Sequence, residues 1–451
     1  MPERKTIQDY LQAVGEQIRW KRARPVVLWE LERHLEDQRD AFAAEGRENP
    51  EELAVAEMGD PVSVGAELDL LHRPRPQWGL LALTLLLAAA GAFLRFWLTR
   101  DFSIYFAEKP SHVVGGFVLG CLALLCGYFL DVGRLGRYPG LVYLGALAAS
   151  VVSLAVFPNT NGVSYYTRYV SLCFPVVYAL WLYGCRGKGW KGQAFAILGG
   201  VPLAVVCMEI PHAFGLLLLL TAGGVMLLLA AVWDWFGIGR WKSLPLPAAA
   251  AAGVLAAAID NVHSSGYLAA RLEAAFHPET DPLGAGWTSI MIKKVLEISR
   301  WLGEGDLGGG SVESFEMMVP DCDQSALLTT LIYRMGWLPF LLVAVALAVL
   351  VVWLLCRCVR QKSKLGRLVA LAVGMTLLGE ALCSVAWNLG FAFLAAEFPL
   401  VMGNLHTVLA MGLIGLALSV FRGDSIARET RGRAVHLPRV RLRISLERIE
   451  Q

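Results

Sequence analysis

The residues best suited to chemistry lie in segment 277–287, which reads HPETDPLGAGW and contains the carboxylate of Asp281. Proline and glycine punctuate this segment, so a turn-rich loop is predicted there between hydrophobic stretches. A loop between membrane spans faces water on one side of the membrane. A carboxylate in that position can meet the polar head group of a substrate.

Hydrophobic spans must position this loop. Hydrophobic residues make up 56% of the chain and charged residues 17%, whereas soluble domains hold about 45–50% apolar and about 25% charged residues. Several apolar runs exceed the roughly 18 residues that cross a bilayer. We therefore predict an all-α, polytopic membrane protein of about ten transmembrane helices, over residues 78–99, 113–132, 138–157, 169–184, 194–207, 213–236, 244–259, 326–355, 368–394 and 398–421.

The distribution of Lys and Arg predicts how these spans are oriented, because short connections rich in these residues stay in the cytoplasm. Such residues gather at both termini and in alternate connections, at Arg134/Arg137, Arg186/Lys188/Lys191, Arg240/Lys242 and Arg357/Arg360/Lys362/Lys364/Arg367. Both termini are therefore expected in the cytoplasm. The opposite set of connections holds few cations and includes the long segment 260–324, so Asp281 is expected outside the cytoplasm.

The composition argues against other classes of protein. A net charge of +2 does not favour a nucleic-acid-binding protein. The nine cysteines show no metal-binding spacing, and most lie inside predicted spans, so neither a metal site nor a structural disulfide is expected. A long charged segment precedes the first span. We therefore expect this span to be a membrane anchor rather than a cleaved leader.

The segments before and after the spans are expected to be separate units. In residues 1–76, Thr6 and Asp9 form a capping pair, and apolar residues then recur at helical spacing, which predicts a small cytoplasmic helical domain. ELERHLEDQ at 30–38 and MGDPVSVGAEL at 58–68 resemble the HAAS-type helical domain of Gram-positive membrane proteins. That resemblance implies signalling or docking; the alternative is a solvated cap without a partner. The basic tail 423–451 either lies on anionic lipid or only fixes the topology.

The membrane part resembles the SEDS family (shape, elongation, division and sporulation), the RodA/FtsW/SpoVE-type peptidoglycan glycosyltransferases. Four pieces carry the resemblance in the family's order: DPLGAGW at 281–287, LGEGDLGGGS at 302–311, VPDCDQSALLTTLIYRMGW at 319–337 and PLVMGNLHTVLAMGLIGLALSV at 399–420. The ten spans and the long outer loop before the eighth also agree with the family. The resemblance covers roughly residues 78–422.

This resemblance implies an activity and a catalytic residue. Family members polymerise lipid II at the outer face of the bacterial cytoplasmic membrane, and the family's catalytic aspartate falls on Asp281. A sugar hydroxyl is a poor nucleophile until a carboxylate accepts its proton, and the diphosphate is its own good leaving group. The resemblance also implies a class B penicillin-binding protein transpeptidase as partner, and a divalent cation as a possible cofactor.

Cations near Asp281 would stabilise the charge that develops on the departing diphosphate. Arg271, Lys293, Lys294 and Arg300 flank Asp281, although each could equally be an interfacial anchor. Thr288 stands where the family usually has a glutamine, and we include it with Arg271, Lys293 and Lys294 as candidate substrate-binding residues. The glycines of segment 303–310 either cradle phosphate or form a flexible loop.

Other departures mark a divergent branch of the family. Ser325 stands where an aspartate is expected, although Asp321 and Asp323 lie close, and the family's Gln-Pro-Ser-Glu motif is absent from 169–184. Pro211-His212 replaces a common Pro-Asp pair. These differences bear on activity more than on fold.

Polar residues inside the spans are few. Glu380 is the clearest, because an ionisable group at such depth usually faces the bundle interior and has a partner, for which Arg334 is the candidate. A functional role and a structural ion pair are equally compatible with it. His406 is expected to be a hydrogen-bonded packing histidine.

The sequence leaves three functions open. The favoured one is lipid II polymerisation at the outer face of the membrane. The alternatives are a catalytically inactive SEDS homologue that regulates or scaffolds cell-wall synthesis, and a transporter of lipid-linked precursors. Asp281 discriminates between them, because neither alternative requires a base in the outer loop.

Overall fold

The computed structural model describes residues 6–74, 76–102, 109–157, 164–209, 213–264, 266–306, 312–319, 321–401 and 404–423. Within these residues the chain is helical and contains no strand. The predicted all-α membrane fold is confirmed. Pro211-His212, the glycines of segment 303–310 beyond Gly305, and the basic tail after Gly423 lie outside the described residues.

The N-terminal segment folds into four helices: α1 (Ile7–Gln17), α2 (Arg24–Ala44), α3 (Pro50–Met58) and α4 (Pro61–His72). Thr6 and Asp9 form the predicted capping box, each accepting a hydrogen bond from the backbone of the other. Tyr10, Val14 and Leu35 belong to a hydrophobic core that these helices share among themselves. The segment is therefore a small helical module with its own core. Its relationship to the HAAS domain stays a prediction.

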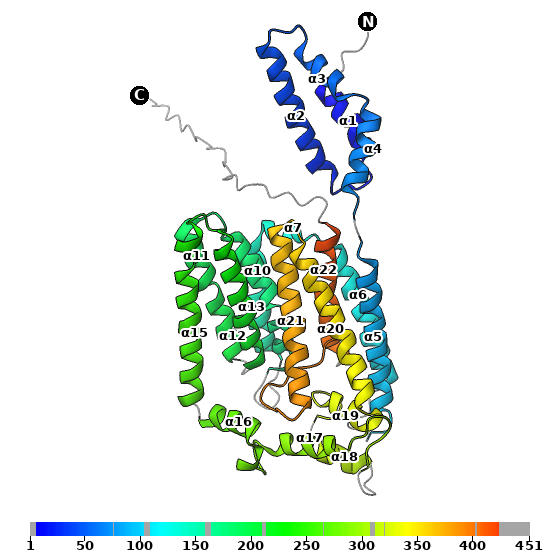
Figure 1. The fold of residues 1–451 in the computed structure, drawn as a ribbon, viewed down its shortest axis with the longest axis vertical. Helices are drawn as coiled ribbons and strands as arrows, with labels where there is room; N and C mark the ends of the chain where they lie inside the picture. The colour runs from blue at the N-terminus through cyan, green and yellow to red at the C-terminus, as the bar shows by residue number, and fades with distance from the viewer. Residues whose placement is uncertain are drawn as a thin grey trace, which may run out of the picture.

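Long helices form the membrane bundle and run roughly parallel to one another (Figure 1). They are α5 (Trp78–Thr99), α6 (Pro110–Phe129), α8 (Pro139–Val156), α10 (Phe174–Gly184), α11 (Gly189–Leu198) with α12 (Gly200–Glu209), α13 (Ala213–Val232), α15 (Pro245–Ser264), α20 (Trp337–Val359), α21 (Lys364–Asn388) and α22 (Asn404–Arg422). In the described residues, 8 helices are long and apolar enough to cross a membrane, with α11 and α12 taken as one. α10 is shorter.

Shorter helices occupy the two ends of the bundle. They are α7 (Val132–Arg137), α9 (Tyr165–Ser171), α14 (Arg240–Ser243), α16 (Gly266–Phe276), the 3-10 helix η1 (Pro278–Thr280), α17 (Trp287–Ile298), α18 (Val312–Met318) and α19 (Leu327–Met335). In Figure 1, α16, α17 and α18 lie across the end of the bundle opposite the N-terminal module. The long loop predicted between the seventh and eighth spans is thus largely helical.

Three predicted spans have the wrong bounds. The span over 326–355 is divided at Gly336, where a φ of +100° ends α19, and only α20 is long enough to cross the membrane. The next two spans were predicted to extend over 389–394 and 398–403. Instead, α21 ends at Asn388 and an irregular connection follows, with φ of +90° at Gly390 and +66° at Leu400. Apolar composition alone cannot distinguish a buried connection from a helix.

α21 and α22 are the most buried spans. Glycines allow α22 to approach α6 closely: a Cβ on Gly127 would come within 2.5 Å of the Gly412 carbonyl oxygen, and one on Gly415 would meet the Leu124 carbonyl oxygen. In hydrocarbon, small residues let helix backbones approach and gain van der Waals contact. This packing gives the bundle a rigid centre against which the outer elements rest.

Candidate functional site

Asp281 lies in a tight turn between η1 and α17, at the end of the bundle opposite the N-terminal module (Figure 1). Its carbonyl oxygen accepts hydrogen bonds from the backbone N–H groups of Gly284 and Gly286, at 3.3 and 3.0 Å. Its carboxylate Oδ2 accepts one from the Ala285 N–H at 2.8 Å. The turn therefore fixes the carboxylate while leaving it exposed to solvent.

The glycines of the DPLGAG sequence are needed for this turn. A Cβ on Gly284 would meet the Asp281 carboxylate, and a Cβ on Gly286 would meet the Pro278 carbonyl oxygen. The glycines three and five residues after Asp281, which are visible in the sequence, are thus the ones that let the backbone close around Asp281. An exposed carboxylate held by one hydrogen bond keeps lone pairs free to accept a proton.

The candidate substrate-binding residues lie on the helices that flank this turn. Thr288 is half-buried in the first turn of α17, and Lys294 is exposed further along it. Arg271 is half-buried on α16. No ion pair links Asp281 to Lys293 or Lys294 in the described part of the chain. The structure thus brings these residues to one end of the molecule without placing them in direct contact.

Lys293 is half-buried and packs beneath the bundle. Its side chain fills the space beside Gly390, where an added Cβ would come within 2.8 Å of Lys293 Cγ. Its Nζ lies 5.9 Å from the centroid of the Phe391 ring. Ile292, Trp387 and Ala392 form a small apolar cluster next to it. α17 therefore rests on the connection between α21 and α22.

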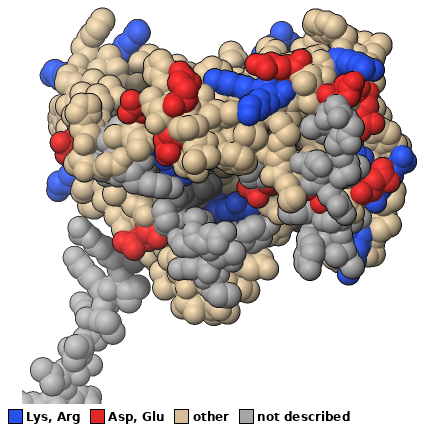
Figure 2. Space-filling model, turned by 90° about the horizontal axis from the view of Figure 1, so that it is seen from below, with Lys and Arg blue, Asp and Glu red and all other residues tan. Residues whose placement is uncertain are grey.

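Charged side chains lie in separate groups on the same end of the molecule, among uncharged residues (Figure 2). Figure 2 shows basic and acidic groups in adjacent patches across this face, with a hollow near its centre where atoms of both charges meet.

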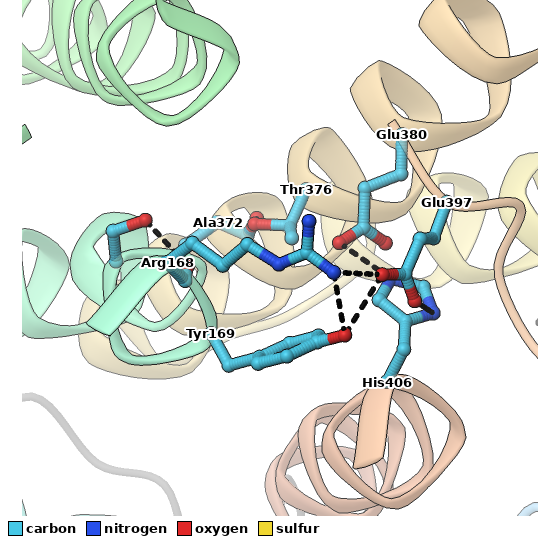
Figure 3. Close-up of polar contacts among 8 residues, drawn as sticks. Arg168, Tyr169, Ala372, Thr376, Glu380, Glu397 and His406 are labelled. Atoms are coloured by element: carbon cyan, nitrogen blue, oxygen red, sulfur yellow. Dashed lines mark hydrogen bonds and ion pairs between the residues drawn. The ribbon is translucent and has the colours of Figure 1, made fainter. Parts of the chain in front are cut away.

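A second polar site lies inside the bundle, and Figure 3 shows its side chains pointing toward one another. Arg168 and Tyr169 come from α9, Glu380 from α21, Glu397 from the connection between α21 and α22, and His406 from α22. His406 Nε2 and Glu380 Oε1 are 3.1 Å apart, and the two side chains are 2% and 3% exposed. We call these five residues the buried cluster.

The predicted pairing of Glu380 with Arg334 is wrong. Arg334 instead lies 3.4 Å from the Asp101 carboxylate and over the Phe102 ring, on α19 at the end of the bundle opposite the N-terminal module. The reason is the break at Gly336, which removes Arg334 from the eighth span and places it on the separate helix α19. His406 is hydrogen-bonded and buried, as predicted.

The buried cluster lines a cavity of about 30 Å³, enough for one or two water molecules. Ser325, which stands where the family usually has an aspartate, also lines it. Sequence reasoning missed Glu397. The sequence feature that could have indicated Glu397 is a single carboxylate between two apolar stretches, in AAEFPL at 395–400.

A buried polar clasp joins α19 to the end of α21 beside this cavity. Asn388 Oδ1 accepts hydrogen bonds from the Thr329 N–H at 2.8 Å and the Thr329 hydroxyl at 2.9 Å. Asn388 Nδ2 donates to the carbonyl oxygens of Ser325 and Ser384. Nearby, outside the spans, burial raises the pKa of the Asp323 carboxyl, and the positive charge of Arg95 partly opposes that rise.

The described residues do not form a metal site. In the described ranges, no three His, Cys, Asp or Glu side chains are grouped so that they could hold a metal ion. Near Asp281, His277 Nδ1 and Glu279 Oε1 are 3.8 Å apart. The Asp281 carboxylate is not part of this pair.

Comparison with known proteins gives a partial sequence match and a fold match. No family model matches the chain. Probable peptidoglycan glycosyltransferase FtsW of Trichlorobacter lovleyi is 25% identical over 168 residues, which are 37% of this chain and 43% of that protein. The matched part is therefore less than half of the relative's length.

The solved structures match over a longer stretch. A chain of a peptidoglycan synthase complex, described as coordinating polymerization and crosslinking, matches 77% of this chain and 98% of its own length, with a TM-score of 0.58 and 17% identity. The rod shape determining protein RodA of Thermus thermophilus matches with a TM-score of 0.48 and 16% identity, over 77% of this chain and 97% of its own.

The chain is a polytopic helical membrane protein that shares its fold with the matched chain of the peptidoglycan synthase complex. The partial match to FtsW and this shared fold agree with the resemblance to the SEDS family that the sequence motifs carry.

Proposed function

We propose that this protein is a peptidoglycan glycosyltransferase that polymerises lipid II at the outer face of the bacterial cytoplasmic membrane. The observation that carries the proposal is the exposed carboxylate of Asp281, held by a glycine-dependent turn across one end of a SEDS-type bundle. By the resemblance of segment 281–287 to the SEDS family, Asp281 corresponds to the family's catalytic aspartate.

In the proposed reaction, Asp281 accepts the proton of a sugar hydroxyl on one lipid II molecule. The hydroxyl oxygen forms a bond with the anomeric carbon of a second molecule, and the bond from that carbon to the diphosphate breaks. The bonding electrons leave with undecaprenyl diphosphate. Lys293, Lys294 and Arg271 lie on the flanking helices and would stabilise the charge that develops there.

The proposed topology puts both termini and the N-terminal module in the cytoplasm. The basic connections carried by α7, α14 and the start of α11 lie at the same end of the bundle as the module (Figure 1). That arrangement supports the orientation that their Lys and Arg content predicts. The N-terminal module is then a docking unit, and a class B penicillin-binding protein is the partner on the outer side.

The direct test is polymerisation of labelled lipid II by the purified full chain, with and without a class B penicillin-binding protein, with products separated by gel electrophoresis. Glycan strands that require wild-type protein and disappear in Asp281→Asn support the proposal. Binding of lipid II without any polymer, under conditions where a purified FtsW is active, would favour a regulatory or transport function.

A further inference from the structure

Glu397 is the point at which three separate segments meet. Its Oε1 accepts a hydrogen bond from Arg168 Nη2 at 2.7 Å and another from the Tyr169 hydroxyl at 2.8 Å. Its Oε2 lies 4.0 Å from His406 Nδ1. The carboxylate is 11% exposed, and Figure 3 shows it at the centre of the buried cluster. An ion pair in such surroundings is screened far less than one at the surface.

The segment that carries Glu397 has little other polar support. It is the irregular connection between α21 and α22, in which Leu400 adopts a φ of +66°. In the described residues of this connection after Phe393, the backbone hydrogen bond runs from the Val401 N–H to the Phe398 carbonyl oxygen. At 3.4 Å it is a long bond. The bonds from Glu397 to α9 are therefore a main polar restraint on this connection.

The other end of the same connection supports α17. The Ala392 N–H donates to Ser289 Oγ at 3.4 Å, and Ala392 packs against Ile292. Gly390 and Phe391 hold the Lys293 side chain, as described above. α17 in turn begins directly after the Asp281 turn.

We infer that Glu397 is a positioning residue, which acts through the connection between α21 and α22 to place Lys293 on α17 for the diphosphate of the substrate. This inference rests on the proposed function. Loss of the bonds to Arg168 and Tyr169 frees the connection to shift, and Lys293 shifts with it. Because Glu397 does not itself reach the outer face, its effect is on substrate binding rather than on proton transfer at Asp281.

The test is a double-mutant cycle in which KM and kcat for lipid II are measured on the full chain for Glu397→Gln, Lys293→Met and the two combined. Glu397→Gln keeps the shape of the side chain and removes its charge. We expect it to raise KM about 5- to 30-fold, the factor that corresponds to about 1–2 kcal/mol, with a smaller change in kcat. The double variant should bind no worse than Lys293→Met alone.

Asp101→Asn is the matched control, because it breaks the Arg334–Asp101 ion pair at the same end of the bundle without touching the connection. Its effect on KM should multiply with that of Lys293→Met. If the effects of Glu397→Gln and Lys293→Met also multiply, Glu397 acts independently of Lys293 and the inference is overturned. Should Glu397→Gln not fold, Glu397→Asp, which keeps the charge and shortens the reach, enters the same cycle.

A second measurement does not depend on catalysis. Hydrogen exchange of the α17 amides should be faster in Glu397→Gln than in wild type, and unchanged in Asp101→Asn. Unaltered exchange in Glu397→Gln would also overturn the inference. If the wild-type protein makes no polymer but exchange in α17 is faster in Glu397→Gln than in wild type, the mechanical link is retained and the proposed function is rejected. The two failures are therefore distinguishable.

Discussion

His406 and Glu380 form a hydrogen bond of 3.1 Å between α22 and α21, with both side chains almost fully removed from solvent. Ionisable groups inside a membrane bundle are costly unless they are paired. This contact therefore satisfies two such groups at once, and it places them beside the cavity that Glu397 and Arg168 also line.

Removal of one member of this pair should destabilise the bundle. Glu380→Ala leaves His406 Nε2 without its acceptor, and we expect the free energy of unfolding to fall by about 1.5–3 kcal/mol, the range for a hydrogen bond to a charged group. Unfolding in detergent, followed by circular dichroism, measures the change. The paired replacement Glu380→Leu with His406→Leu should lose less than the sum of the single variants. Strict additivity would contradict the coupling.

Asp281→Asn should abolish most of the polymerisation without disturbing the fold. The amide oxygen of asparagine can still accept the Ala285 N–H, so the turn persists, but asparagine cannot take a proton. We expect turnover to fall about 10²- to 10⁴-fold, as for loss of a general base. Initial rates with labelled lipid II, together with the melting temperature, check this. Unchanged turnover would exclude Asp281 as the base.

Labelling of single cysteines should establish the orientation of the chain. A cysteine at Glu279, next to the Asp281 turn, should react with a membrane-impermeant thiol reagent in intact cells. One at Ser363, at the start of α21, should react only after lysis. Both are introduced into a chain whose nine native cysteines are replaced. The reverse pattern would place the Asp281 turn in the cytoplasm.

Deletion of residues 1–72 should leave polymerisation by purified protein largely intact while reducing recovery of partners from cells. The N-terminal module has its own core and lies at the opposite end of the bundle from Asp281 (Figure 1). It touches the membrane domain through Arg22, which donates to the Phe129 carbonyl oxygen at 2.6 Å and lies 3.9 Å from Asp131. A folded but inactive truncation would show that this contact couples the module to the site, and Arg22→Ala would then reproduce the loss.

Gly415→Ala should destabilise the bundle by more than about 1 kcal/mol, because the new Cβ would meet the Leu124 carbonyl oxygen and force α22 away from α6. Gly145→Ala on α8 is the matched control, since nothing lies within 4 Å of its added Cβ. That change should be neutral or stabilising by about 0.4–1 kcal/mol. Equal melting temperatures for the two variants would show that the helices adjust freely.

The sequence by itself determined the features that depend on neighbouring residues. Hydropathy located most of the membrane helices, because a span must be apolar along its length. It did not locate the ends of the last three. The capping box of Thr6 and Asp9 formed as predicted because it needs only a three-residue spacing. The Asp281 turn is also a local feature of this kind. Gly284 and Gly286 lie within the same segment, and their lack of a Cβ leaves the space that the turn needs.

Tertiary structure alone decided which distant residues meet. Glu380 is paired with His406 rather than Arg334 because a break at Gly336 rotates Arg334 out of the bundle, and one residue of positive φ is not visible as a change in hydropathy. Glu397 lies in the buried cluster because the irregular connection that carries it folds back against α9, where Arg168 donates to its carboxylate. Contacts of this kind join segments far apart in the chain, and they depend on how whole helices pack rather than on local spacing.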